Sequence, residues 1–130
     1  MDQNIKSRLS EALENIPEID FAFLFGSAVT GELCRSSDID IAVYLNQDLT
    51  LDLISKIVSE VEKISGHTCD LSILNQSTEI FSFEVLKGEL LFVRESKIEL
   101  YAGFYSITCR EYEDKMVWMK KQLAYRGYLK

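Results

Sequence analysis

The chain has 130 residues, of which 47% are hydrophobic and 27% charged. This composition is typical of one folded domain spanning 1–130, and it excludes a disordered chain. A net charge of −7 argues against direct binding of nucleic acid, which needs clustered Lys and Arg. No apolar run reaches the roughly 18 residues needed to cross a membrane.

The number and spacing of the cysteines indicate whether the protein is found in a reducing or an oxidising compartment. Cys34, Cys69 and Cys109 are irregularly spaced, and the chain has one histidine, His67. An odd number of cysteines without a CxxC pair disfavours both a disulfide framework and a zinc site, and favours buried thiols. The N-terminal segment lacks the layout of a signal peptide. We therefore expect a cytoplasmic location.

Hydrophobic periodicity and turn residues divide the chain into eight elements, in the order helix, strand, strand, helix, strand, helix, strand, helix. The first strand is almost continuously apolar, which predicts burial on both faces. A polar loop or short helix separates it from the second strand. The predicted elements cover residues 3–16, 20–25, 38–45, 49–64, 68–74, 77–87, 89–94 and 96–130.

Capping residues mark the later helices. Gly66 follows the amphipathic helix predicted over 49–64 and is a C-cap candidate. Ser77 and Thr78 can both cap the start of the next helix, and Gly88 can end it. The last helix is expected to be long, with Gly103 or Thr108 as the places where it could break. Two adjacent strands followed by separated ones predict an α/β (α+β) fold, with a mixed four-stranded sheet packed with helices.

Acidic residues gather around the first two strands. Gly26-Ser27 ends the first strand, and Asp38 and Asp40 begin the second after ten intervening residues. Side chains two apart on a strand point to the same face, and two carboxylates held together repel unless a cation lies between them. Hard divalent metals such as Mg²⁺ prefer carboxylate oxygens. Asp70, on the third strand, is a third carboxylate that could converge on the same edge.

The Gly-Ser pair adds a second kind of ligand. Gly26 permits a sharp turn and a close approach, and the Ser27 hydroxyl with the following N–H groups can bind a phosphate. Alone, a Gly-Ser pair is commonly a turn, two spaced aspartates are commonly a polar strand edge, and Asp70 could cap a helix or pair with a lysine. Their combination favours a metal and phosphate site for in-line phosphoryl-type displacement.

A family resemblance follows from these motifs. The stretch FGSAVTGELCRSSDIDIAVYL resembles the GSx10DxD signature of the DNA polymerase β-like nucleotidyltransferases. It is most similar to the minimal nucleotidyltransferase (MNT) branch, the antitoxin half of HEPN–MNT toxin–antitoxin modules. CDLSIL resembles the family's third-carboxylate strand, and FEVLKGELLFVRE its helix, glycine and short strand. The resemblance covers residues 20–95 and implies the polymerase β-like nucleotidyltransferase fold.

The resemblance also implies roles for residues. Gly26 and Ser27 would bind the nucleotide's phosphates, and Asp38, Asp40 and Asp70 would bind catalytic Mg²⁺. Asp70 would in addition accept the proton of the attacking hydroxyl. In the toxin–antitoxin branch the reaction implied is transfer of AMP from ATP to a tyrosine of the HEPN ribonuclease toxin, which neutralises it. The implied partners are ATP and the toxin, in a hetero-oligomer.

One departure from the family pattern concerns positive charge. Many relatives have Arg within a stretch like GSxARG, whereas here Ala28, Val29 and Thr30 follow the Gly-Ser pair. The nearest basic residue is Arg35. Either Arg35 supplies positive charge to the triphosphate, or it is a solvated loop residue and the substrate binds more weakly.

Two other functions remain open from the sequence. A small-molecule nucleotidyltransferase usually needs a further helical domain to hold its acceptor, and 130 residues leave no space for one. A binding-only antitoxin would have a degenerate site, whereas the acidic set is intact. The last helix is apolar nearly all round, so we expect one face to pack on the sheet and the other faces to contact a partner. Aromatic and Met side chains are enriched in interfaces. The aromatic and Met residues of this helix include Tyr101, Phe104, Tyr105, Tyr112, Met116, Trp118 and Met119.

Overall fold

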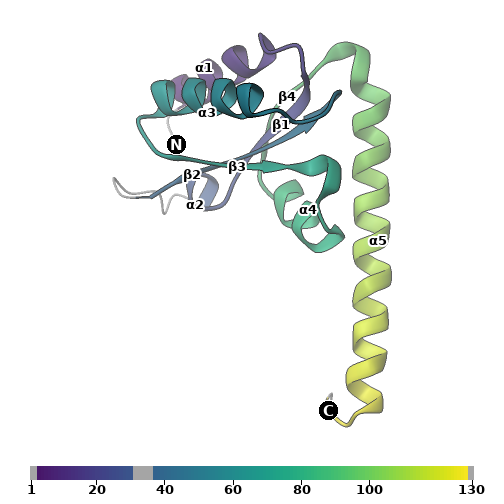
Figure 1. The fold of residues 1–130 in the computed structure, drawn as a ribbon. Coiled ribbons are helices and arrows are strands. Elements are labelled where there is room, and N and C mark those ends of the chain that lie inside the picture. Colours follow the sequence, from purple (N-terminus) through teal and green to yellow (C-terminus); the bar gives the residue numbers. More distant parts are fainter. Residues whose placement is uncertain (1–2, 31–36, 129–130) are drawn as a thin grey trace.

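The computed structural model describes residues 3–30 and 37–128, and its main elements follow the predicted order (Figure 1). The strands are β1 (Ile19–Phe25), β2 (Ile39–Leu45), β3 (Cys69–Ile73) and β4 (Glu89–Val93). The helices are α1 (Gln3–Glu14), α2 (Ser27–Thr30), α3 (Leu51–Ser65), α4 (Glu79–Leu86) and α5 (Ile98–Tyr125), with short 3₁₀ helices η1 (Leu74–Gln76) and η2 (Glu95–Lys97).

The four strands form one mixed sheet in the order β3-β2-β1-β4, which confirms the predicted fold class. β2 pairs with β3 in parallel, and β1 pairs with β2 and with β4 antiparallel. The end of β1 therefore lies beside the beginnings of β2, β3 and β4. This arrangement brings the residues before and after these strand ends to one edge region of the sheet.

β1 is the buried centre of the sheet, as its apolar sequence predicts. Six of its seven residues are buried, and only Phe25 is partly exposed. Phe21 and Phe23 pack in the core on one face of the sheet, while Ala22 and Leu24 pack in the core on the other. Both faces must therefore be covered by helices.

Two helical layers cover the two faces. Figure 1 shows α1 and α3 above the sheet and α4 below it, while α5 passes beside the sheet and continues beyond the body. Leu9, Leu13, Ile57 and Val61 of α1 and α3 pack in the first core. Val85 of α4 packs in the second core, where residues of α5 cover the phenylalanines of β1.

α5 is continuous over 28 residues, so the suggested break near Gly103 or Thr108 is wrong. A Cβ at Gly103 would meet nothing within 4 Å, so this glycine faces open space, and one glycine in a helix costs only about 1 kcal/mol. Thr108 is buried against the body, where packing holds the helix. Within residues 3–30 and 37–128, no helix is both long and apolar enough to cross a membrane.

The predicted caps are present, and Gly88 has an additional role. Gly66 ends α3 in the left-handed conformation at φ 75°, and the Thr78 side chain accepts a hydrogen bond from the Phe81 N–H at the start of α4. A Cβ at Gly88 would lie 2.8 Å from the Cβ of Phe25. Gly88 is therefore needed for close packing of the α4–β4 turn against β1.

Arg94, just after β4, ties three parts of the chain together. Its guanidinium donates to the backbone carbonyls of Glu14, Ile16 and Ile19 at 2.8–3.1 Å. The guanidinium thus gives a charged donor to the carbonyl of the last residue of α1, to one carbonyl of the following turn and to that of the first residue of β1. The sequence pattern identifies Arg94 only as the end of a strand, because nothing local marks the carbonyls that it reaches.

Candidate functional site

Gly26 turns the chain out of β1 and leaves room for a carboxylate. It has φ 73°, a conformation that favours glycine, and is followed directly by α2. Phe25 pairs with Asp40 across β1 and β2. A Cβ on Gly26 would overlap the Asp40 carboxylate and lie 3.1 Å from its Cγ. The space that a side chain at residue 26 would take is therefore occupied by Asp40.

Strand alternation places the acidic residues on one face. Asp40 shares its face of β2 with Ala42 and Tyr44, which pack in the core that α4 and α5 cover. Asp38 lies two residues before Asp40 and directly precedes β2. Asp40 and Asp70 are directly paired in the parallel β2–β3 ladder. The structure thus brings Gly26, Asp40 and Asp70 together, with Asp38 at the beginning of the same strand.

The electrostatics of Asp40 reflect this crowding. Asp40 is partly buried, whereas Asp38 and Asp70 are exposed. Burial raises the pKa of the Asp40 carboxyl above its usual value, and the charges of Asp70 and Asp38 and a hydrogen bond with Asp70 raise it further. A carboxylate held beside two others is stabilised by a cation, which would reverse this effect on the pKa.

The carboxylates of Asp38, Asp40 and Asp70 are chemically suited to binding a divalent cation. Carboxylate oxygens on adjacent strands are the ligands that Mg²⁺ prefers, with remaining positions taken by water and substrate phosphates. In the part of the chain that the structure describes, no three acidic, histidine or cysteine side chains are already converged as a complete metal site. Asp70 already makes a side-chain hydrogen bond with Asp40, and Asp38 is exposed at the beginning of the strand that carries Asp40.

The region after Ser27 continues into the core. Ser27 begins α2 and is partly exposed, while Ala28 is buried and Val29 packs against the core of the α1–α3 face. The backbone N–H of Val29 donates to the Gly26 carbonyl at 3.1 Å, which fixes the turn. Arg35, the predicted source of positive charge, lies outside the described residues, as does Cys34.

Two side chains near the acidic edge were not predicted to take part. The Cys69 N–H, at the start of β3, donates to Oε2 of Glu62 on α3 at 2.8 Å. Nδ1 of His67 lies 3.1 Å from the carbonyl oxygen of Ser37, immediately before Asp38. The α3–β3 turn brings Glu62 to Cys69, and the parallel β2–β3 pairing brings His67 to Ser37. The single histidine three residues before Asp70 was a signal available in the sequence.

Of the two cysteines that the structure describes, Cys69 and Cys109, Cys69 directly precedes Asp70 on β3. It is half-buried, and burial followed by the charges of Glu62, Asp70, Asp40 and Asp38 raises the pKa of its thiol to about 12. The thiolate is the reactive form of cysteine, so Cys69 is inert at neutral pH. The expectation of buried thiols is met only in part, since Cys69 and Cys109 are both partly rather than fully buried.

Three clefts lie away from the carboxylates. One of about 580 Å³ lies between the end of β2, η1 and the start of α5, one of about 450 Å³ lies between α1 and α3, and one of about 450 Å³ lies between α4 and α5. None of these three has Asp38, Asp40 or Asp70 in its walls. Asp38 and Asp70 are instead exposed, at an open rim of the sheet.

The fold and the acidic rim define a nucleotidyltransferase-type domain. The family model described as "Polymerase beta, Nucleotidyltransferase" matches residues 7–97, most of the chain. The chain belongs to this polymerase β nucleotidyltransferase family. A comparison with curated proteins gives no match.

Solved structures share the fold over nearly the whole chain. One is a tri-AMPylated Shewanella oneidensis HEPN toxin in complex with MNT antitoxin, with 21% identity and a TM-score of 0.67. Another is a toxin–antitoxin with AMP-PNP, with 24% identity and a TM-score of 0.69. A third is the toxin–antitoxin MntA–HepT, with 22% identity and a TM-score of 0.66. Each match covers 95% of this chain and 97% of the other.

Proposed function

We propose that this protein is the antitoxin of a HEPN–MNT module and transfers AMP from ATP to a tyrosine of its HEPN ribonuclease toxin. The observation that carries the proposal is the close approach of Asp40 to Gly26 and Asp70, in a chain of the nucleotidyltransferase family. Structures of the same fold that contain a tri-AMPylated HEPN toxin or AMP-PNP support the choice of acceptor and nucleotide.

The reaction forms one bond and breaks one bond at the α-phosphorus of ATP. The tyrosine oxygen attacks the α-phosphorus, the bond from this phosphorus to the β-bridging oxygen breaks, and pyrophosphate leaves. Asp70 is exposed on the open rim, and in the proposed reaction its carboxylate would accept the tyrosine proton. The product is an AMP–tyrosine phosphodiester, and the toxin gains the mass of AMP less that of water.

The proposed ligands divide between the two charged parts of the substrate. Asp38, Asp40 and Asp70 would hold Mg²⁺, while Gly26, Ser27 and Arg35 would contact the triphosphate. Bound Mg²⁺ would lower the pKa of the attacking hydroxyl and neutralise charge on the leaving pyrophosphate. The expected cytoplasmic location suits this reaction, because ATP is abundant there.

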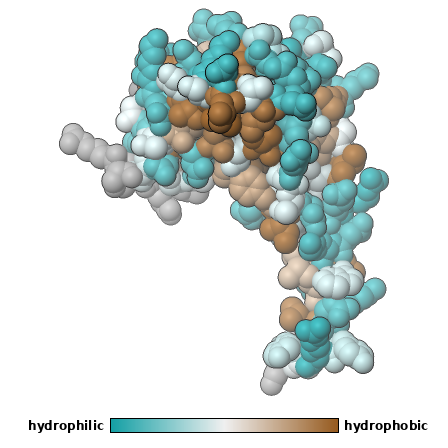
Figure 2. Space-filling view, in the orientation of Figure 1, coloured by the Kyte–Doolittle hydropathy of each residue, from teal (hydrophilic) through white to brown (hydrophobic). Residues whose placement is uncertain are grey.

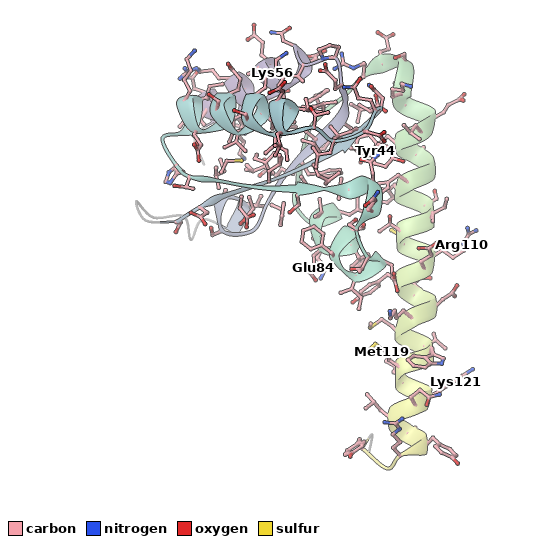
Figure 3. All side chains as sticks on the ribbon, in the orientation of Figure 1. Tyr44, Lys56, Glu84, Arg110, Met119 and Lys121 are labelled. Carbon is pink, nitrogen blue, oxygen red and sulfur yellow. The ribbon has the colours of Figure 1, made fainter. Side chains whose placement is uncertain are left out.

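The part of α5 beyond the body is the surface that we assign to the toxin. Figure 2 shows apolar and hydrophilic side chains along this segment, and Figure 3 shows Met119 and Lys121 on it, away from the body. Trp118 is 58% exposed. Residues 116–128 contain three basic and no acidic residues, in a chain of net charge −7. This segment therefore fits an apolar surface with acidic residues at its margin.

The experiment is intact-mass spectrometry of the purified toxin after incubation with this protein, ATP and Mg²⁺. The expected result is a gain of one or more AMP units with the wild-type protein and none with Asp38→Ala/Asp40→Ala. Peptide mapping is expected to place each AMP on tyrosine. Equal gains with both proteins, or no gain, would overturn the transferase proposal.

The same reactions separate the other two functions. A toxin that loses ribonuclease activity on binding, without gaining mass, would indicate a binding-only antitoxin. AMP transfer to small hydroxyl compounds in the absence of toxin would indicate a small-molecule nucleotidyltransferase.

A further inference from the structure

His67 lies where α3 turns back toward the sheet. Gly66 ends α3 in the left-handed conformation, so the chain reverses and enters β3 within three residues. The reversal brings the half-buried His67 side chain to the segment before β2. Its Nδ1 atom lies 3.1 Å from the carbonyl oxygen of Ser37. A carbonyl oxygen only accepts, so Nδ1 carries the hydrogen, as it can in both neutral and protonated imidazole.

The contact between His67 and Ser37 lies just before the first residue pair of the β2–β3 ladder. The N–H of Ile39 donates to the carbonyl of Thr68 at 2.8 Å, and Ile39 then pairs with Cys69. The hydrogen bond of His67 reaches Ser37, which lies on the other side of Asp38 in the chain. Asp38 is therefore held between two cross-connections to the α3–β3 turn, one through Ser37 and the other through Ile39.

The location matters because β3 is at the edge of the sheet and the acidic residues repel one another. Asp38 lies outside the β2 ladder, and Asp40 and Asp70 face each other within it. Repulsion among the three carboxylates favours separation of the segment before β2 from the start of β3. A hydrogen bond between the Ser37 carbonyl and His67 opposes that separation.

We propose that His67 is a positioning residue, which holds Asp38 in place relative to Asp40 and Asp70 for binding of Mg²⁺ and nucleotide. The inference rests on the proposed nucleotide site, but not on the identity of the acceptor. Positioning groups of this kind contribute to metal affinity by fixing the ligands before the metal binds.

The test compares three variants of His67 in the full-length protein. The amide of Asn can place an N–H close to the position of Nδ1, whereas the longer Gln places its amide nearer the position of Nε2. His67→Ala and His67→Gln are expected to weaken binding of Mg²⁺ with ATP by about 10-fold or more, measured by calorimetry without toxin. His67→Asn is expected to bind within about threefold of wild type, since it restores the donor.

A matched control separates positioning from general stability. Asn46, just after the other end of β2, donates through Nδ2 to the carbonyl of Pro17 at 2.8 Å and to Asp20 at 2.9 Å. Asn46→Ala is expected to lower the Tm without changing the affinity for Mg²⁺ with ATP. The Tm of each variant is measured without ligand.

Wild-type affinity in His67→Ala and His67→Gln would overturn the inference, as would equal loss in all three His67 variants. The same affinity loss in Asn46→Ala as in His67→Ala would also overturn it. A wild-type protein that binds Mg²⁺ with ATP but adds no AMP to the toxin would contradict the proposed function and leave the inference standing.

Discussion

Asp40 links the backbone of the site to its chemistry. Its carboxylate fills the space beside Gly26, and the residue pairs with Asp70 on the next strand. Burial and the two neighbouring aspartates raise the pKa of Asp40. Ionised Asp40 therefore lowers the stability of the metal-free fold. This loss of stability is absent below the ordinary carboxyl pKa, and it is complete once the pH has risen above the higher pKa of the folded state.

Asp40→Asn is consequently expected to raise the Tm of the metal-free protein at pH 7 while abolishing function. The difference in Tm should shrink as the pH falls below the ordinary carboxyl pKa of 3.8, because the wild-type carboxyl is then protonated in both the folded and the unfolded state. AMP transfer should fall by about 100-fold or more, since losing even an outer partner of a metal ligand costs about 10- to 100-fold. Thermal melts with and without Mg²⁺ check this. A lower Tm at pH 7, or an equal rise with Mg²⁺ in both proteins, would contradict it.

Arg94 gives a prediction for the fold alone. Arg94→Ala removes a charged donor from three backbone carbonyls and is expected to lower the free energy of unfolding by about 2–3 kcal/mol. Arg94→Lys should recover only part of this, because an ammonium cannot form the same fork. Urea denaturation measures both. A loss below about 0.5 kcal/mol in Arg94→Ala would show that water replaces the guanidinium.

The residues of the site differ in how far the sequence could predict them. The spacing of Gly26, Asp38 and Asp40 predicts that they meet, because two strands joined by a short connection pair with each other. The contact of Asp40 with Gly26 depends on strand register, and the contact of His67 with Ser37 depends on the parallel β2–β3 pairing. Neither is encoded in a local pattern. The metal and phosphate roles remain predictions.

At the scale of elements, the two halves of the continuous helix α5 have different surroundings. Its first half covers the β1 phenylalanines, with the ring of Phe104 5.4 Å from that of Phe21 and 5.7 Å from that of Tyr44. The Lys115–Glu79 ion pair, at 2.8 Å, joins it to α4. Beyond this point Figure 1 shows the helix leaving the body. The helical spacing of apolar residues predicts the helix, but it does not tell which turns lie on the sheet.

Substitutions in the two halves should therefore act on different properties. Phe104→Ala is expected to cost about 2 kcal/mol or more of folding free energy, because it removes ring contacts in the core. Trp118→Ala should change stability by less than about 0.5 kcal/mol. Trp118→Ala should instead weaken toxin binding by about 10-fold or more, as loss of a buried interface Trp does.

The matched control for Trp118 is Leu51→Ala, since Leu51 is 84% exposed at the start of α3, on the other side of the sheet. Leu51→Ala should leave both stability and toxin binding unchanged. Calorimetric titration of each variant into toxin gives the affinities. Equal affinities for the wild-type, Trp118→Ala and Leu51→Ala proteins would remove α5 from the proposed interface.

At the scale of the whole molecule, the two proposed surfaces lie in different places. The carboxylates occupy an open rim where β1 ends and β2 and β3 begin, while the basic segment of α5 extends beyond the body. In the proposed complex, a toxin bound along α5 would have to extend to this rim to present its tyrosine. The mixed sheet was predictable from the order of elements, whereas the direction of α5 follows from packing of aromatic side chains on one half of it.

The most direct measurement uses ATP labelled at either the α- or the γ-phosphorus, incubated with the toxin, this protein and Mg²⁺. Adenylyl transfer predicts stable label on the toxin from α-labelled ATP, none from γ-labelled ATP, and no transfer by Asp38→Ala/Asp40→Ala. Label from γ-labelled ATP would indicate phosphoryl transfer. Label that is independent of both aspartates would contradict the proposed site.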